Sequence, residues 1–106
     1  MYGLSSDTLS RIEAECSKVQ AIEKVVLYGS RAKGNYRTGS DIDITLFGDN
    51  LTLANSVYPL MDRLDELCLP YSFDISIFNY IDNKNLVEHI NRVGKTIYLI
   101  AIEKSE

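Results

Sequence analysis

Apolar side chains recur along the chain with two different periods, which predicts that helices and strands alternate. A spacing of three to four residues indicates a first helix capped by Ser6 or Asp7 and a last helix capped by Asp82 and closed by Gly94. The first helix has an apolar stripe formed by Leu9, Ile12, Cys16 and Val19. The last helix has one formed by Leu86, Val87, Ile90 and Val93.

A third helical pattern extends over residues 51–68 and contains a proline. Pro59 lacks the backbone N–H that a helix interior requires, so it either kinks this helix or marks the start of its regular part. Pro70 follows the pattern and ends it.

Strands are predicted where β-branched and aliphatic residues run together or alternate with polar ones. These segments are residues 24–28, 42–47, 72–78 and the tail 96–102, and a short helical turn is expected over residues 30–33. The tail is either a final strand or a docking surface. The pattern predicts an α/β (α+β) fold, with a small mixed sheet flanked by helices, in one domain spanning residues 1–106.

Three aspartates lie on the polar faces of two predicted strands. Asp41 and Asp43 alternate with apolar residues of one strand, and Asp74 does the same in a later strand. If the two strands are neighbours, the three carboxylates converge on one face of the sheet. The apolar residues that point the other way are Ile42, Ile44, Leu46, Phe73, Ile75 and Ile77.

Converging carboxylates repel one another unless a cation shares the site. Oxygen-only ligands with positions left for phosphate oxygens suit Mg²⁺, either one ion or a pair, and Mn²⁺ also fits. The alternative is that Asp41, Asp43 and Asp74 are ordinary surface acids, with Asp74 on the solvated face of an edge strand.

The sequence GSRAKG, from Gly29 to Gly34, follows the first predicted strand directly. Gly29 allows phosphate to approach the backbone, and Ser30 offers a hydroxyl and an amide at a helix start. Arg31 and Lys33 are candidate phosphate-binding cations, although Arg31 is equally suited to a structural ion pair. The glycine spacing and the ending differ from those of a Walker loop. The ordinary alternative is a capped, tight turn.

GSRAKG, the SDID sequence ending at Asp43 and the FDISIF strand around Asp74 together resemble the nucleotidyltransferase superfamily typified by DNA polymerase beta. The length and element order are similar to its minimal nucleotidyltransferase (MNT, MntA-type) family. This resemblance implies a polymerase beta-like palm fold. It also implies that Gly29 and Ser30 bind the triphosphate of ATP and that Asp41, Asp43 and Asp74 are the catalytic and metal-binding acids.

Members of the MNT family commonly act beside a HEPN-domain protein, a helical ribonuclease toxin. The resemblance therefore implies an antitoxin that transfers AMP from ATP to a tyrosine of this toxin and releases pyrophosphate. Two other functions stay open: a binding module that neutralises its partner by occlusion, and a small-molecule nucleotidyltransferase. The short chain favours an acceptor that supplies its own binding surface.

Composition and charge narrow the possible partners and location of the protein. The net charge of -4 argues against a general nucleic-acid-binding protein, which needs a basic surface. No membrane-spanning run or signal sequence is apparent, and Cys16 and Cys68 are expected to be buried, reduced thiols. We therefore expect a cytoplasmic location.

Overall fold

The computed structural model describes residues 1–37 and 39–100, and its elements follow the predicted order. The helices are α1 (Ser6–Ser17), the short α2 (Ser30–Lys33), α3 (Tyr58–Asp65) and α4 (Lys84–Val93). The strands are β1 (Lys24–Tyr28), β2 (Ile42–Phe47), β3 (Phe73–Ile77) and β4 (Lys95–Leu99). They form one sheet in the order β3-β2-β1-β4. The predicted fold class, a mixed sheet flanked by helices, is confirmed.

Strand direction follows from the connections between the strands. β1 pairs antiparallel with β2 on one side and with β4 on the other, whereas β2 and β3 run parallel. A parallel pair needs a crossover connection, and α3 supplies it between β2 and β3. This arrangement leaves β3 and β4 as the two edge strands.

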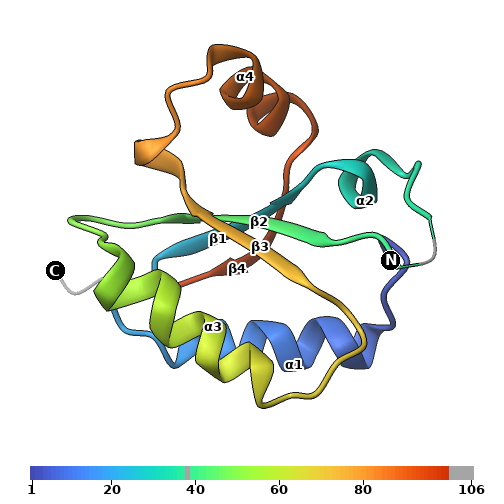
Figure 1. The fold of residues 1–106 in the computed structure, drawn as a ribbon, viewed down its shortest axis with the longest axis horizontal. Coiled ribbons are helices and arrows are strands. Elements are labelled where there is room, and N and C mark those ends of the chain that lie inside the picture. The colour runs from blue at the N-terminus through green and yellow to red at the C-terminus, as the bar shows by residue number, and fades with distance from the viewer. Residues whose placement is uncertain (38, 101–106) are drawn as a thin grey trace, which may run out of the picture.

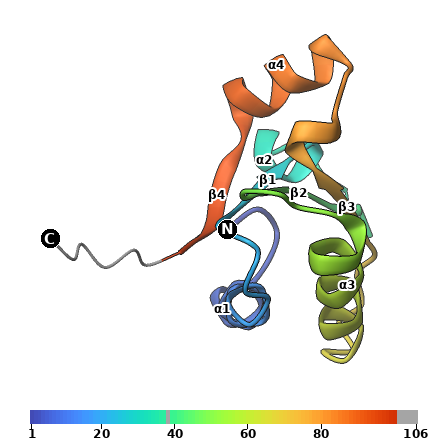
Figure 2. The same cartoon turned by 90° about the vertical axis from the view of Figure 1, so that its left-hand side faces the viewer.

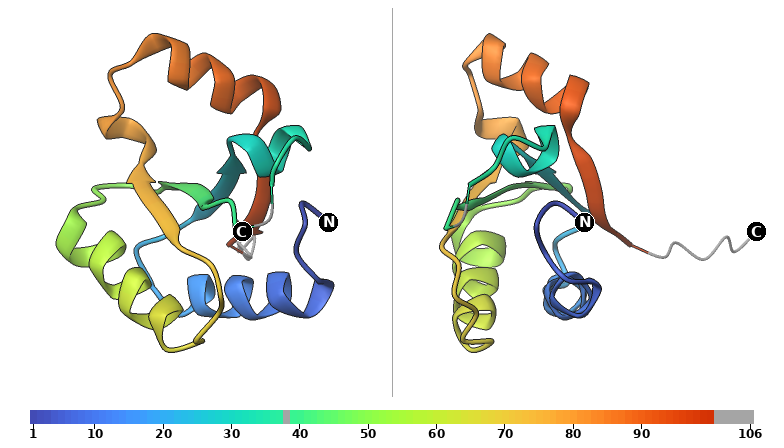
Figure 3. Two further views of the ribbon diagram at one scale, coloured as in Figure 1. Left: turned by 45° about the vertical axis from the view of Figure 1, so that its right-hand side comes forward. Right: turned by 90° about the vertical axis from the view of Figure 1, so that its right-hand side faces the viewer.

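The two faces of the sheet are covered unequally. Helices α1 and α3 pack against one face, and α4 lies over the other (Figures 1 and 3). The larger core lies on the α1 and α3 side. There the apolar stripes of both helices pack against the apolar residues that occupy every second position of the strands. Its fully buried members are Ile12, Cys16, Ile22, Val25, Leu27, Ile42, Ile44, Leu46, Leu60 and Leu64.

A smaller apolar cluster holds α4 against the opposite face. Ile90 of α4 packs with Val26 and Tyr28 of β1. Phe47, at the end of β2, stacks on Phe78 with ring centroids 4.5 Å apart. On the same face, β2 and β3 carry the polar residues Asp43, Thr45, Asp74 and Ser76.

Helix ends differ slightly from the prediction. The first cap is Ser5, whose hydroxyl accepts the N–H of Thr8, and the last is Asn83, which accepts two backbone N–H groups. The predicted caps, Ser6 or Asp7 and Asp82, were therefore displaced by one or two residues. Short polar side chains adjoin both boundaries, and sequence alone does not rank them.

Pro59 marks the start of the regular helix, as one of the two alternatives predicted. A π-helical turn, Leu53–Val57, precedes α3, and Pro59 lies in the first turn of α3, where its missing N–H costs no hydrogen bond. The helix ends before residue 68, and Cys68 is exposed at a left-handed position. The expectation of a buried Cys68 was wrong, whereas Cys16 is buried.

The tail forms a strand, as one alternative predicted. β4 covers residues 95–99, while residues 101 and 102 of the predicted segment lie outside the described residues. Among the helices of the described chain, none has the length and apolar character to cross a membrane.

Candidate active site

Asp43 and Asp74 are direct neighbours across the parallel pair of β2 and β3. Neighbouring strands lie about 4.8 Å apart, and residues directly opposite one another project from the same face of a sheet. Asp43 is also opposite Tyr28 of the antiparallel partner β1. The predicted neighbourhood of the two aspartate-bearing strands is therefore present, and Asp41 extends the same face just before β2 begins.

The electrostatic environment of Asp43 reflects this crowding. Burial raises the pKa of its carboxyl above the ordinary value, the negative charges of Asp74 and Asp41 raise that pKa further, and His89 opposes the shift. Burial also raises the pKa of the Tyr28 phenol on the same face. Asp41 and Asp74 are exposed, so a ligand can reach the acid face.

Gly29 forms the turn between β1 and α2. Its backbone, with φ of +78° and ψ of -155°, has a conformation that residues with a side chain rarely adopt. A Cβ at this position would overlap Oδ2 of Asp43. The bare Cα of Gly29 thus lies directly against the central carboxylate, and Ser30 follows as the first residue of α2. The predicted glycine turn and the predicted acids belong to one site.

His89 joins the same site, although no motif in the sequence indicates this position. The backbone N–H of Gly29 donates to Nε2 of His89 at 3.1 Å. The His89 ring meets Tyr28 edge to face at a centroid distance of 6.2 Å. Because His89 lies 60 residues from Gly29, only the docking of α4 on the sheet reveals the contact. Its position beside the buried Ile90 was the one available signal.

Arg31 has a structural role in the free chain. Its side chain is only 3% exposed. Nε and Nη2 donate to the carbonyl oxygen of Ser40, and Nη1 donates to that of Tyr2. The guanidinium also lies over the rings of Tyr36 and Tyr71, at 5.3 and 4.9 Å. These contacts indicate that Arg31 anchors the loop after α2, and they favour this role over the predicted contact of Arg31 with phosphate.

Lys33 differs from Arg31 because its side chain is exposed. No ion pair of Lys33 occurs within residues 1–37 and 39–100. Ser30 is partly exposed at the start of α2. Their predicted contacts with phosphate stay predictions, as do the catalytic roles of the aspartates.

The donor chemistry of the acid face suits a hard divalent cation. Asp41, Asp43 and Asp74 form no ion pair with any described cationic side chain, and oxygen is the only ligand type that they offer. The described residues contain no group of three or more His, Cys, Asp or Glu side chains close enough to hold a metal. An ion at this face would therefore need oxygens from phosphate or water as well.

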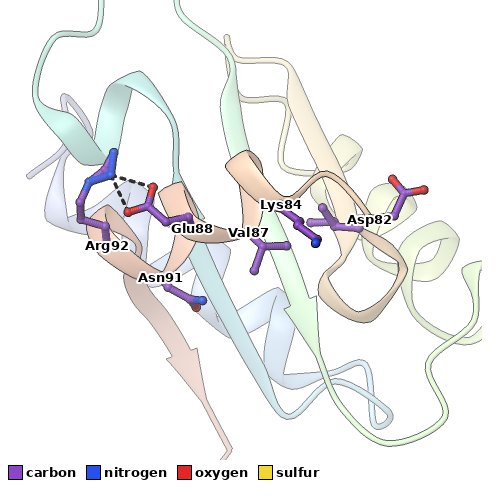
Figure 4. A pocket seen from close by; sticks show the side chains of 7 residues that line it. Asp82, Lys84, Val87, Glu88, Asn91 and Arg92 are labelled. Atoms are coloured by element: carbon purple, nitrogen blue, oxygen red, sulfur yellow. Dashed lines mark hydrogen bonds and ion pairs between the residues drawn. The ribbon is translucent and has the colours of Figure 1, made fainter.

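A separate depression lies along a different side of α4. Figure 4 shows it beside an ion pair between Arg92 and Glu88, whose closest N···O distance is 2.9 Å. Leu86 and Ile90, on another side of the helix, pack against the sheet. The residues lining the depression are Ile81, Asp82, Lys84, Val87, Glu88, Asn91 and Arg92. None of the site residues described above contributes to it.

Acids on neighbouring strands of a mixed sheet thus lie beside a glycine turn that opens a helix. The family model described as polymerase beta, nucleotidyltransferase matches residues 10–102. The chain therefore belongs to this family, as the resemblance implied. A search of curated proteins gave no match to the sequence.

Solved structures share the fold. A toxin-antitoxin with AMP-PNP matches at a TM-score of 0.70 and 18% identity, covering 87% of this chain and 73% of that one. A mutant of the toxin-antitoxin MntA-HpeT matches at 0.66 and 15%, covering 92% and 75%. A protein from Sulfolobus solfataricus described as a nucleotidyltransferase matches at 0.52 and 20%, covering 84% and 74%.

Proposed function

We propose that this nucleotidyltransferase is a Mg²⁺-dependent antitoxin that transfers AMP from ATP to a tyrosine hydroxyl of a partner HEPN ribonuclease toxin. The observation that carries the proposal is the direct pairing of Asp43 with Asp74, with the bare Cα of Gly29 against Asp43. The cytoplasm is the proposed location.

The similar structures support this choice of donor and partner. Two of them are toxin-antitoxin structures, and one of these contains AMP-PNP, an analogue of ATP. The mutant structure carries glutamate in place of two aspartates separated by one residue, which is also the separation of Asp41 and Asp43.

Asp41, Asp43 and Asp74 are the residues that would hold Mg²⁺, together with oxygens of phosphate or water. When bound, the cation supplies charge neutralisation at the phosphates and a lower pKa for an oxygen nucleophile. The clustering fits this role, because clustered like charges destabilise the free fold and a cation compensates them. Mn²⁺ is the expected substitute.

The residues of the chain bind and orient the reactants. Ser30 and the Gly29 turn hold the triphosphate, and exposed Lys33 neutralises its outer oxygens. The tyrosine oxygen forms a bond to the α-phosphorus while the bond to the bridging oxygen of pyrophosphate breaks. The tyrosine proton passes to Asp74 or to solvent. Positioning and charge stabilisation therefore provide most of the rate enhancement.

Intact-mass analysis of the co-expressed partner tests this function. The protein encoded beside this chain should gain the mass of one AMP, or of several, when it is co-expressed with the wild-type chain. It should stay unmodified with Asp43→Asn. A tightly bound but unmodified partner in both samples would instead support neutralisation by occlusion. If purified small-molecule acceptors gain AMP and the partner does not, the chain is a small-molecule nucleotidyltransferase instead.

A further inference from the structure

Strand β3 has a free edge beside the acid face. It is the first strand in the order β3-β2-β1-β4, and among the described residues it pairs only with β2. Figure 2 shows β3 at the rim of the sheet, with α3 beneath it. Its central residue, Ile75, is only partly buried, although it packs on the core. Free strand edges are templates for an added strand.

The backbone groups that face this edge can be assigned from the pairing. The N–H of Ile42 in β2 donates to the carbonyl of Ser72 at 2.8 Å. Backbone groups alternate between the two sides of a strand, so Asp74 and Ser76 also direct their N–H and C=O groups to β2. The backbone groups of Ile75 consequently point outward. An added strand would bond to Ile75, and its next residues would lie opposite Asp74 and Ser76.

An exposed, acidic face of α3 runs along the same edge. Tyr58, Met61, Asp62 and Asp65 follow helical spacing, and all four are exposed. Met61 and Asp65 form a hollow with Phe73 at one end of β3. A second hollow, which contains Ile77 and Tyr80, lies at the other end. The only cation of α3, Arg63, instead pairs with Glu15 of α1 at 3.5 Å.

We propose that the free edge of β3 binds an extended, basic segment of the acceptor protein as a fifth strand, with its tyrosine opposite Asp74. This proposal rests on the proposed function and adds to it the conformation and charge of the acceptor segment. Side chains of an added strand alternate between the two faces. The tyrosine therefore projects over the acid face, and its two neighbours in sequence project towards α3, whose Met61 lines a hollow with Phe73.

Charge and polarity specify the segment further. The residues flanking the tyrosine are apolar, because the α3 side of this edge exposes apolar atoms of Met61. The positions three residues from the tyrosine face α3 again and carry lysine or arginine, because the helix face beside the edge carries Asp62 and Asp65. Directly opposite side chains on neighbouring strands are about 5 Å apart, which puts the tyrosine beside the carboxylate of Asp74.

A synthetic peptide tests the binding without the natural partner. The probe has about nine residues, enough for a short strand, with a central tyrosine and isoleucine directly before and after it. Lysine or arginine stands three residues from the tyrosine on each side, so that it faces α3, and serine or threonine fills the other positions. Hydrogen exchange of the full chain should slow at the Ile75 amide when the peptide is added. The Ser76 amide, which bonds to β2, should be protected with or without the peptide and serves as the internal reference. Unchanged exchange at Ile75 with saturating peptide would overturn the proposal.

Modified peptides and variants identify the contacts. N-methylation of the peptide's edge-facing amides should weaken binding about fivefold or more for each hydrogen bond lost. Exchanging its lysines and arginines for glutamates should abolish binding. Asp65→Lys should weaken binding, whereas Glu13→Lys, the same charge change on α1, should not. Ile75→Pro removes an outward N–H and should also weaken binding. Equal binding by the methylated peptide would refute strand addition without requiring any variant to fold.

Label transfer separates this inference from the proposed function. A peptide that protects Ile75 but receives no label from α-labelled ATP would support the docking edge and contradict tyrosine adenylylation of a segment held there. A partner that is adenylylated while Ile75 exchanges freely in the complex would support the function and refute the docking edge.

Discussion

Replacement of Gly29 by alanine tests whether the glycine turn serves the carboxylate site or only the backbone. The backbone conformation of Gly29 costs an alanine about 1–3 kcal/mol. Its Cβ would also meet Oδ2 of Asp43, and rotating that carboxylate away adds about 1 kcal/mol. Gly29→Ala should therefore lower the free energy of unfolding by roughly 2–4 kcal/mol. A displaced carboxylate should slow transfer on the order of a hundredfold.

Gly34→Ala is the matched control. Gly34 also has a positive φ, +91°, but no atom outside its own neighbours lies within 4 Å of an added Cβ. It should lose only the backbone cost of about 1–2 kcal/mol and keep most of its transfer rate. Urea unfolding measures the stability of both variants. Label transfer from ATP, measured without urea and at the same temperature for both, gives the rate. Equal transfer rates in Gly29→Ala and Gly34→Ala would refute the role assigned to the close packing on Asp43.

Three other residues give separate predictions. Arg31→Lys should destabilise the fold by about 2–3 kcal/mol in urea unfolding, because lysine cannot reproduce the forked bonds to two carbonyls; an unchanged midpoint would contradict this role. The pKa of Asp43 is raised in the folded chain, so protonation favours folding and the free energy of unfolding should fall as pH rises from about 3.8 through that raised pKa. In metal-free buffer, Asp43→Asn should remove this fall. If the free energy of unfolding of Asp43→Asn had the same pH profile as that of the wild-type chain, the raised pKa of Asp43 would be contradicted. His89→Ala should raise the KM for ATP, because the Gly29 N–H loses its acceptor. His89→Gln keeps an acceptor and should bring the KM part of the way back. Equal KM values for the wild-type chain and both variants would show that His89 does not position the Gly29 amide.

The strand faces could be predicted from sequence because side chains alternate strictly along a strand. The buried positions Ile42, Ile44 and Leu46 follow that alternation, so Asp43 had to lie on the other face. The register that sets Asp43 opposite Asp74 is a property of two strands separated by a helix, and alternation alone does not determine it. The resemblance of the motifs to known nucleotidyltransferases supplied the expectation that these strands are neighbours.

The roles of Arg31 and His89 could not be read from local sequence. A cation in a glycine motif favours phosphate binding, yet Arg31 turns towards Tyr2 and Ser40, whose carbonyls meet only after the chain folds. His89 lies on α4, and the helix approaches the glycine turn only through the packing of Ile90 on β1. Contacts between distant segments depend on the tertiary arrangement, whereas helix and strand patterns depend on near neighbours.

The most direct test of nucleotidyl transfer compares two positions of the label in ATP. The purified chain, Mg²⁺ and the co-encoded partner are incubated with ATP labelled at either the α-phosphate or the γ-phosphate. The α-label should enter the partner's tyrosine, the γ-label should appear in pyrophosphate, and Asp43→Asn should abolish both results. Transfer of the γ-label to the partner, or α-label transfer at the full rate by Asp43→Asn, would contradict the assigned reaction and the role of the acid face.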